Sequence, residues 1–147
     1  MKGYWGSRFK TRASIQDGWM HTGDLATMDE DGYITVVGRS KDMVIRGGEN
    51  IYPVEVENYL YRHPKIRDVQ IVGIPDQHYG EVLVAWIITK EPNSLSEDEV
   101  RQFCCEHIAH YKVPTHFRFV DEYPMTVTGK IQKYKIAEHM IKELALE

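Results

Sequence analysis

A glycine–lysine turn near the end of the chain has the residue types best suited to chemistry. The segment runs Pro124-Met125-Thr126-Val127-Thr128-Gly129-Lys130-Ile131. Gly129 allows a tight turn next to a ligand, and Lys130 can then project a mobile ammonium into a neighbouring site. Because ammonium groups suit phosphate oxygens and developing negative charge, the turn predicts a lysine that acts on such groups. A solvated lysine in a surface turn is the alternative for this segment alone.

A second set of candidate residues lies in the first third of the chain. Asp24 closes the glycine-containing turn His21-Thr22-Gly23-Asp24, where a carboxylate can accept two hydrogen bonds from a ribose diol. The alternative is an aspartate that bonds its own turn backbone. Arg39 has a rigid donor fork that could reach the same nucleotide. Lys41 follows at a charged boundary, where a few residues can absorb a large backbone rotation, or where the chain is simply a linker.

A third candidate is the pair Gly47-Gly48 within Arg46-Gly47-Gly48-Glu49-Asn50. Two adjacent glycines without side chains can let a slender ligand pass close to the backbone. The alternative is a simple hairpin turn.

Length and composition narrow the class of protein. The chain has 147 residues, enough for one ordinary domain, or for one small domain and a piece of another. With Lys+Arg 18 against Asp+Glu 22 the net charge is −4, which argues against general nucleic-acid binding. The sequence has neither an apolar run of membrane-spanning length nor an apolar signal-peptide core. Its cysteines, Cys104 and Cys105, are adjacent, which favours a reducing compartment over secretion.

The elements that must position these residues follow from periodicity and turn signals. We expect an irregular segment over 1–18 and a hairpin over 19–37 around Asp29-Glu30-Asp31-Gly32. A second hairpin over 43–52 precedes a helix that starts at Pro53. Further expected elements are strands at 69–74, 82–88 and 117–120, a helix with a Ser96/Glu99 capping box whose apolar spacing reaches Ile108, and a helix through 136–144. This order predicts an α+β fold, a small domain with a short sheet flanked by helices.

The three motifs together resemble a known superfamily. HTGD, GRSKDMVIRGGENIYPVEVE and PMTVTGKIQK, in this order, are similar to the adenylate-forming enzymes: acyl-CoA synthetases, peptide synthetase adenylation domains and luciferases. Within this superfamily, the sequence of the second motif is most similar to that of the medium-chain acyl-CoA synthetase family member 2 group and its bacterial relatives. The resemblance implies three parts. Residues 1–38 would be the tail of the N-terminal AMP-binding domain and would contain a remnant β-hairpin of that domain. Residues 39–42 would be a hinge, and residues 43–147 would be the C-terminal domain.

The resemblance implies an ATP-dependent fatty acid–CoA ligase with two steps. In acyl-adenylate formation, Asp24 would bind the ribose hydroxyls, Arg39 would support the nucleotide, and Lys130 would bridge the acid and the α-phosphate. Lys41 matches the hinge position, where the family has Asp or Lys.

In the second step CoA displaces AMP. Gly47 and Gly48 would then line the pantetheine tunnel. Tyr79 and Tyr111 would face CoA, with Lys112 near its phosphates. The small domain would rotate about the hinge between the two steps.

The resemblance also places several parts of the enzyme before residue 1. These are the phosphate loop, the acyl pocket and the glutamate that helps to hold Mg²⁺. We therefore expect the chain to be a fragment whose partner is its own N-terminal domain, to be inactive alone, and to expose residues 1–38. The implied compartment is the bacterial cytoplasm or the mitochondrial matrix.

Two other functions remain open at the level of sequence. The chain could belong to an adenylation domain that loads a carrier protein, or it could be a stand-alone, non-catalytic binding module.

Among smaller features, the Cys104, Cys105, His107 and His110 cluster has residue types that could bind a metal ion, but core packing is the better interpretation. The basic stretch Lys130, Lys133 and Lys135 could be a solvated start of the last helix, and among these lysines only Lys130 lies in the turn where chemistry is expected.

Overall fold

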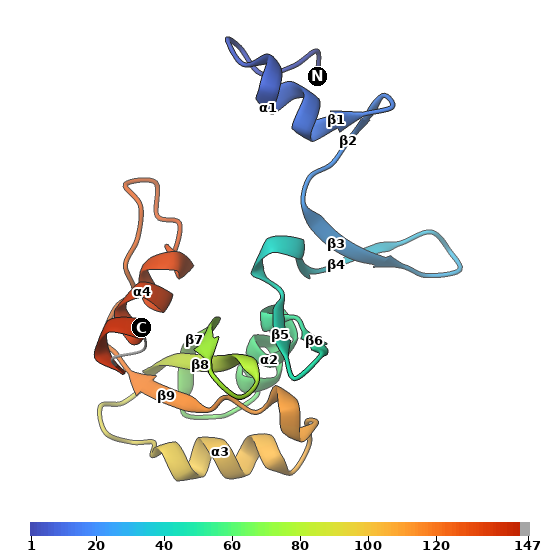
Figure 1. The fold of residues 1–147 in the computed structure, drawn as a ribbon. Helices are drawn as coiled ribbons and strands as arrows, with labels where there is room; N and C mark the ends of the chain where they lie inside the picture. The colour runs from blue at the N-terminus through green and yellow to red at the C-terminus, as the bar shows by residue number, and fades with distance from the viewer. Residues whose placement is uncertain (145–147) are drawn as a thin grey trace. The chain divides into compact units, whose positions relative to one another are not determined.

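The computed structural model describes residues 1–144, which form two compact units, one from Met1 to Lys41 and one that begins at Asp42 (Figure 1). The end of the predicted domain 43–147 lies outside the described residues. A short 3-10 helix, η1 (Ser40–Asp42), contains the boundary between the two units.

The first unit begins with a helix and a small hairpin, so the predicted irregular segment over 1–18 is wrong. The elements are α1 (Arg8–Ser14), β1 (Ile15–Gln16) and β2 (Trp19–Met20). The Ser7 side chain caps α1 by accepting a hydrogen bond from the Lys10 amide, as serine commonly does at this position. Asp17 and Gly18 both have positive φ, 51° and 82°, which suits an Asp-Gly turn between two short strands.

The predicted hairpin around Asp29–Gly32 is present, but its first strand begins at Asp24 rather than Trp19 and its second strand extends to Arg39. It comprises β3 (Asp24–Met28) and β4 (Ile34–Arg39), which pair antiparallel. The Asp29 carboxylate accepts a hydrogen bond from the Tyr33 amide at 2.8 Å. Large apolar side chains of this unit are exposed, as expected, among them Trp5, Phe9 and Trp19.

The second unit is built around a five-stranded sheet. Its order is β6-β5-β8-β7, and β9 pairs with β8 in parallel while the other pairs are antiparallel. Because a parallel pair needs a long crossover, α3 lies between β8 and β9 in the sequence. The elements are β5 (Val44–Arg46), β6 (Glu49–Ile51), α2 (Pro53–Leu60), β7 (Ile66–Asp76), β8 (Gly80–Thr89), α3 (Glu97–Cys105), η2 (His110–Lys112), β9 (His116–Phe119) and α4 (Lys133–Glu143).

The sheet separates two apolar cores. Leu83 and Ala85 of β8 belong to the core that holds α2 and α3, whereas Val84 and Trp86 belong to the core that holds α4. This alternation follows from the two-residue period of a strand whose faces are both covered. The structure thus confirms a small α+β fold whose sheet is flanked by helices and preceded by a β-hairpin.

The end of α3 differs from its predicted position. Ser96 caps the helix, with its hydroxyl accepting from the Glu99 amide at 3.3 Å, but the helix ends at Cys105 rather than near Ile108. Cys104 is fully buried in the core, as predicted, whereas Cys105, His107 and His110 are exposed, so the core-packing interpretation is wrong for these three residues. Within residues 1–144, no group of three His, Cys, Asp or Glu residues is arranged to hold a metal ion.

Gly73 of β7 allows Val44 to pack closely against the sheet. A Cβ atom at Gly73 would lie 2.7 Å from Val44 Cγ2. We expect Gly73→Ala to lower the free energy of unfolding by about 1–3 kcal/mol, since overpacking forces neighbours to move. Urea unfolding of the chain measures this change, and adding Val44→Ala should recover part of it. An unchanged urea midpoint in Gly73→Ala would contradict the close packing.

A buried histidine makes stability depend on pH. His63 is 5% exposed. Its ring packs edge-on against the Phe103 ring, with 4.8 Å between the ring centres, and its Nε2 lies 3.7 Å from Glu99 Oε1. Burial lowers the pKa of His63 below 6.5, and the nearby Lys65 and Lys90 charges also lower it, whereas the Glu99 carboxylate raises it and is outweighed. The unfolded chain therefore takes up this proton at a higher pH than the folded chain.

This contribution to stability is present above pH 6.5 and is lost as the pH falls below it. The free energy of unfolding should decline between pH 7.5 and pH 5.5, with a slope from His63 of at most about 1.4 kcal/mol per pH unit. Urea unfolding at a series of pH values, with His63→Gln as the control, measures it. Equal slopes in the two proteins would show that His63 makes no contribution.

Candidate active site

Lys130 lies at the end of a tight hairpin loop over residues 125–131, here called the Lys130 loop. Met125 and Ile131 form a β-bridge, and the Lys130 amide donates to Thr126 Oγ1 at 3.0 Å. Gly129 has φ 78°, a left-handed conformation that glycine adopts without strain. The Lys130 side chain is exposed, and within residues 1–144 no hydrogen bond or ion pair holds its ammonium group. The loop therefore presents an available cation.

The base of the Lys130 loop is attached to a packed core. The Gln132 amide donates to the Pro124 carbonyl at 2.8 Å, and Ile131 packs against the core that contains α4. Since α4 begins at Lys133, the orientation of the loop depends on how this helix is anchored.

The Gly47-Gly48 pair forms the turn between β5 and β6. Both residues have positive φ, 59° and 90°, so this turn favours glycine at both positions. The Gly47 amide donates to the Tyr79 carbonyl at 2.9 Å. A Cβ atom at Gly47 would lie 3.6 Å from Tyr79 Cδ1. The structure thus brings Gly47, predicted to line the pantetheine tunnel, next to Tyr79, predicted to face CoA.

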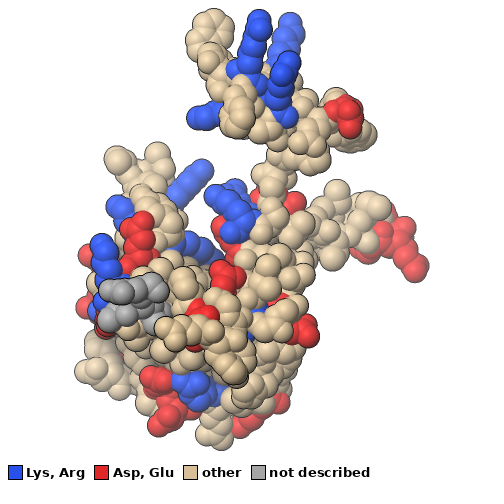
Figure 2. Space-filling model, viewed as in Figure 1, with Lys and Arg blue, Asp and Glu red and all other residues tan. Residues whose placement is uncertain are grey.

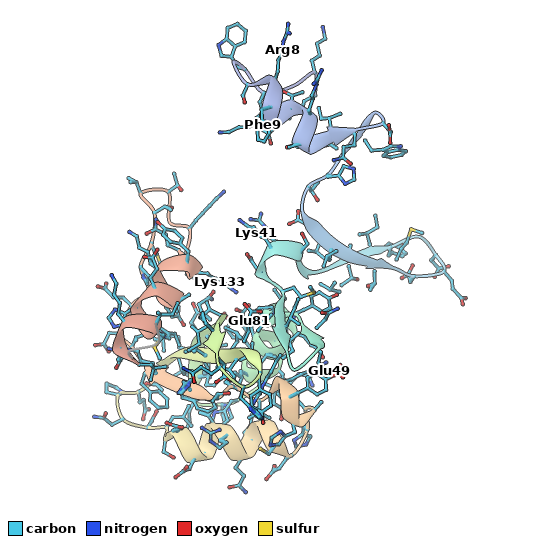
Figure 3. All side chains as sticks on the ribbon, in the orientation of Figure 1. Arg8, Phe9, Lys41, Glu49, Glu81 and Lys133 are labelled. Carbon is cyan, nitrogen blue, oxygen red and sulfur yellow. The ribbon has the colours of Figure 1, made fainter. Side chains whose placement is uncertain are left out.

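Two carboxylates hold Tyr79 and β5 in place. Asp76 Oδ1 accepts hydrogen bonds from the Tyr79 amide at 2.8 Å and from the His78 amide at 2.9 Å. These two bonds, the one from Tyr79 first, lower the pKa of Asp76 below its ordinary value. Glu81, labelled in Figure 3, accepts from the Ile45 amide at 2.7 Å.

Arg46 is a residue that the sequence interpretation missed. Its guanidinium carbon lies 5.1 Å from the centre of the Tyr79 ring, and Nη1 donates to the carbonyls of Tyr111 and Val113 at 2.9 and 3.0 Å. Arg46 therefore joins the glycine turn to η2, which carries Tyr111 and Lys112. Its position directly before Gly47-Gly48 was a signal that could have identified it.

Lys112 is held by an ion pair rather than left available. Its ammonium lies 2.5 Å from Glu55 Oε1 of α2 and 5.8 Å from the centre of the Tyr111 ring. We refer to Arg46, Gly47, Gly48, Tyr79, Tyr111 and Lys112 as the Arg46 cluster. The β5–β6 hairpin, which carries the glycine turn, and the loop that precedes α4 lie in different parts of the second unit (Figure 1).

Asp24 and Arg39 face each other in the first unit. They are partners in the β3–β4 register, and Arg39 Nε lies 3.0 Å from Asp24 Oδ1 with both side chains partly exposed. The Asp24 amide also donates to Thr22 Oγ1 at 3.1 Å. An aspartate beside a guanidinium on an open surface can accept from hydroxyl groups while the arginine binds an anion. Lys41 lies in η1 at the boundary between the units.

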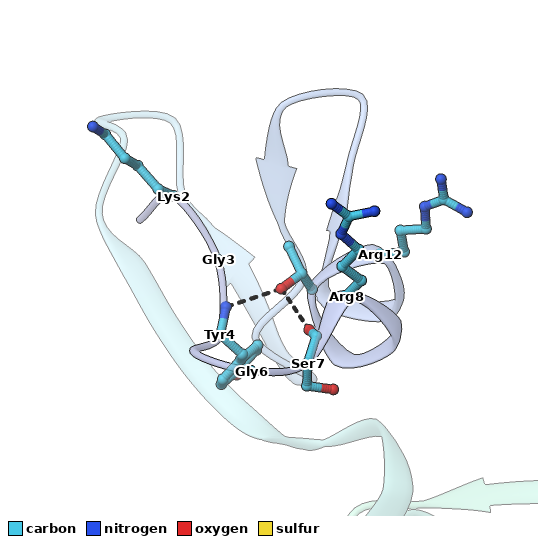
Figure 4. Close-up of a pocket in the computed structure, with 8 residues that line it drawn as sticks. Lys2, Gly3, Tyr4, Gly6, Ser7, Arg8 and Arg12 are labelled. Atoms are coloured by element: carbon cyan, nitrogen blue, oxygen red, sulfur yellow. Dashed lines mark hydrogen bonds between the residues drawn. The ribbon is translucent and has the colours of Figure 1, made fainter.

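The first unit also has a surface pocket at its basic end. Figure 2 shows Lys and Arg side chains gathered over α1. The pocket is lined by Lys2, Gly3, Tyr4, Gly6, Ser7, Arg8, Thr11 and Arg12 (Figure 4). Thr11 Oγ1 accepts from the Tyr4 amide and donates to the Ser7 carbonyl, each at 2.9 Å. None of the predicted site residues lines this pocket, so it stays separate from the candidate active site.

Comparison with protein families identifies the second unit. The profile of the AMP-binding enzyme C-terminal domain matches residues 55–130, which include most of α2, strands β7, β8 and β9, η2 and the Lys130 loop as far as Lys130. The chain therefore belongs to the AMP-binding enzyme C-terminal domain family.

Similar proteins agree with this assignment. A Bacillus subtilis protein named acyl-CoA synthetase YngI is 54% identical over 97% of the chain, which covers 26% of that protein. The human mitochondrial medium-chain acyl-CoA ligase ACSF2 is 48% identical over 99% of the chain, which covers 24% of it. The crystal structure of ATP-bound MatB from Rhodopseudomonas palustris superimposes with a TM-score of 0.89 at 34% identity, over 97% of this chain and 28% of that one.

The chain thus spans about a quarter of the length of the relatives that it matches. These relatives are bacterial and mitochondrial proteins. Among the described helices, none combines the length and the apolar character that a membrane crossing requires.

Proposed function

We propose that this chain is the C-terminal part of an AMP-forming fatty acid–CoA ligase. The observation that carries the proposal is the presence, on one folded unit, of an available lysine loop and a separate glycine–tyrosine cluster. Two surfaces on one domain suit an enzyme that performs two reactions in turn.

In the first reaction the Lys130 loop acts on acyl-adenylate formation. A carboxylate oxygen of the fatty acid attacks the α-phosphorus of ATP, the bond to the β-phosphate oxygen breaks, and pyrophosphate leaves. Negative charge is redistributed over the phosphate oxygens in this step, and a positioned ammonium stabilises it. Lys130 supplies that ammonium, while Asp24 binds the ribose hydroxyls and Arg39 supports the nucleotide.

In the second reaction the Arg46 cluster acts on thioester formation. The CoA thiol releases its proton to solvent and its sulfur attacks the acyl carbonyl carbon, the bond between that carbon and the phosphate oxygen breaks, and AMP leaves. Gly47 and Gly48 let the pantetheine arm pass along the backbone, and Tyr79 and Tyr111 face CoA. Lys112, oriented by Glu55, contributes positive charge near the CoA phosphates.

The two reactions require the second unit to change its orientation. We place the hinge at residues 39–42, with Lys41 at its centre, so that residues 1–38 stay with the N-terminal AMP-binding domain and 43–147 move. A short linker segment can absorb such a rotation. Mg²⁺, which neutralises phosphate charge in phosphoryl transfer, would be held by the N-terminal domain rather than by this chain.

The substrate class and compartment rest on the named relatives. The human relative is a medium-chain ligase of mitochondria and another relative is bacterial. We therefore propose medium-chain fatty acids, ATP and CoA as substrates, and the mitochondrial matrix or the bacterial cytoplasm as the location.

A chimera tests this function. The chain replaces the matching 24% of human ACSF2, and acyl-CoA formation is measured with saturated fatty acids from short to long chains. We expect product formation that requires both ATP and CoA. A folded chimera that forms no acyl-CoA, beside an active human parent, would contradict the proposal. The 147-residue chain alone should form no acyl-CoA and should show no ATP–pyrophosphate exchange.

A further inference from the structure

A buried carboxylate and a lysine meet at the edge of the sheet in the second unit. Glu57 of α2 is 8% exposed, and its Oε1 lies 2.5 Å from the ammonium of Lys133, the first residue of α4. Figure 3 shows Lys133 between α4 and the sheet. The interpretation of Lys133 as part of a solvated helix start is therefore wrong, whereas Lys135 is exposed.

Both side chains also bond to the backbone of one residue of β7. Glu57 Oε1 accepts from the Ile71 amide at 2.8 Å, and the Lys133 ammonium donates to the Ile71 carbonyl at 3.2 Å. Among the described strands, β7 pairs with β8 alone and is an edge strand. Glu57 and Lys133 therefore satisfy the outward-facing groups of Ile71, as a further strand would.

This arrangement ties together helices that belong to opposite faces of the sheet. α2 packs in one core and α4 in the other, and the Glu57–Lys133 pair joins them around the edge of β7. Lys133 is also close in sequence to the Lys130 loop, whose base is closed by the Gln132–Pro124 backbone bond. A fixed Lys133 thus holds the end of the loop from which Lys130 projects.

We propose that Glu57 and Lys133 are positioning residues for acyl-adenylate formation: through the edge of β7 they fix the first turn of α4, and thereby the direction of the Lys130 loop. This inference rests on the proposed function, because it assigns the pair to the step in which Lys130 acts. Neither residue touches the substrates. A misplacement of about 1 Å far from the chemistry can cost about 10²-fold in rate, so loss of the pair should weaken this step selectively.

The first test measures the loop itself in the 147-residue chain. Backbone ¹⁵N relaxation is compared in the wild-type chain, Lys133→Met, Lys133→Arg and the matched control Lys135→Met. We expect the order parameters of Gly129 and Lys130 to fall below about 0.6 in Lys133→Met and to stay near the wild-type values in the other variants. Unchanged order in Lys133→Met would overturn the proposal without bearing on the proposed function.

The second test measures both half-reactions in the ACSF2 chimera. Lys133→Met and Glu57→Gln should lower ATP–pyrophosphate exchange about 10- to 100-fold, and thioester formation from synthetic acyl-adenylate by less than about threefold. Lys133→Arg, which keeps the charge, should restore most of the exchange, and Lys135→Met should not change it. A merely structural role would lower both half-reactions together, and that result would overturn the proposal.

The two proposals fail in distinguishable ways. If Lys130→Ala leaves exchange unchanged in an active chimera, the role of Lys130 in adenylation is wrong, and the relaxation data still decide whether the pair fixes the loop. If Lys130→Ala abolishes exchange but Lys133→Met lowers neither exchange nor loop order, the positioning role alone is wrong.

Discussion

Replacement of Lys130 by alanine is expected to lower ATP–pyrophosphate exchange in the ACSF2 chimera by about 10²–10³-fold, the usual cost of removing a group that stabilises transition-state charge. The Lys130 ammonium is exposed at the end of a loop whose backbone is fixed by hydrogen bonds between Thr126 and both Gly129 and Lys130. The substitution removes the charge without disturbing a packed residue, so the fold should be unaffected. Initial rates of exchange at saturating fatty acid measure the effect.

The control for this prediction is Lys135→Ala, which removes an exposed lysine of α4. It should leave exchange within about threefold of the wild-type rate. Thioester formation from synthetic acyl-adenylate should likewise survive in Lys130→Ala, because we propose a role for Lys130 in the first step only. Loss of exchange in both lysine variants would instead point to a general effect of positive charge.

Replacement of Gly48 by leucine is expected to have the opposite selectivity. Gly48 has φ 90°, and no atom lies within 4 Å of a Cβ built on it, so a side chain there would enter open space next to the β5–β6 turn. If the pantetheine arm uses that space, Gly48→Leu should lower thioester formation from acyl-adenylate by about 10²-fold, as expected when a reactant is misplaced. ATP–pyrophosphate exchange should change by less than about threefold.

Backbone strain must be separated from obstruction in this variant, since a left-handed φ costs a non-glycine residue about 1–2 kcal/mol. Gly32 is the matched control. It has φ 84° and open space around it, in the β3–β4 turn. Gly32→Leu carries the same kind of strain and should leave both half-reactions near the wild-type rates. If both leucine variants lose thioester formation equally, the proposal that the pantetheine arm passes Gly48 is wrong.

The sequence was informative where a signal is local. The turns at Asp29–Gly32, Gly47-Gly48 and Gly129 have residue types that fit their backbone conformations, and all are turns in the structure. The strands predicted at 69–74 and 82–88 are also present, as parts of β7 (Ile66–Asp76) and β8 (Gly80–Thr89). In the first unit, Ser7 and Asp17-Gly18 are equally local signals, for a helix start and a turn, that the prediction of an irregular segment over 1–18 did not use.

The contacts that assemble the candidate site could not be predicted from local patterns. Arg46 reaches the Tyr111 carbonyl across 65 residues of sequence, and Lys133 reaches Glu57 across 76. Both partners are specified by the topology of the sheet, which a single sequence does not reveal. Glu57 shows the consequence: it is a charged residue of a short helix, yet the folded chain buries it against β7.

The measurement that most directly tests the central claim is the ratio of the two half-reactions in one set of chimeras. ATP–pyrophosphate exchange and thioester formation from acyl-adenylate are measured for the wild-type chimera, Lys130→Ala and Gly48→Leu. Two surfaces that serve different steps predict a lower ratio of exchange to thioester formation in Lys130→Ala and a higher ratio in Gly48→Leu. If both variants lose the two activities in parallel, one domain does not present two separate half-sites, and the account is wrong.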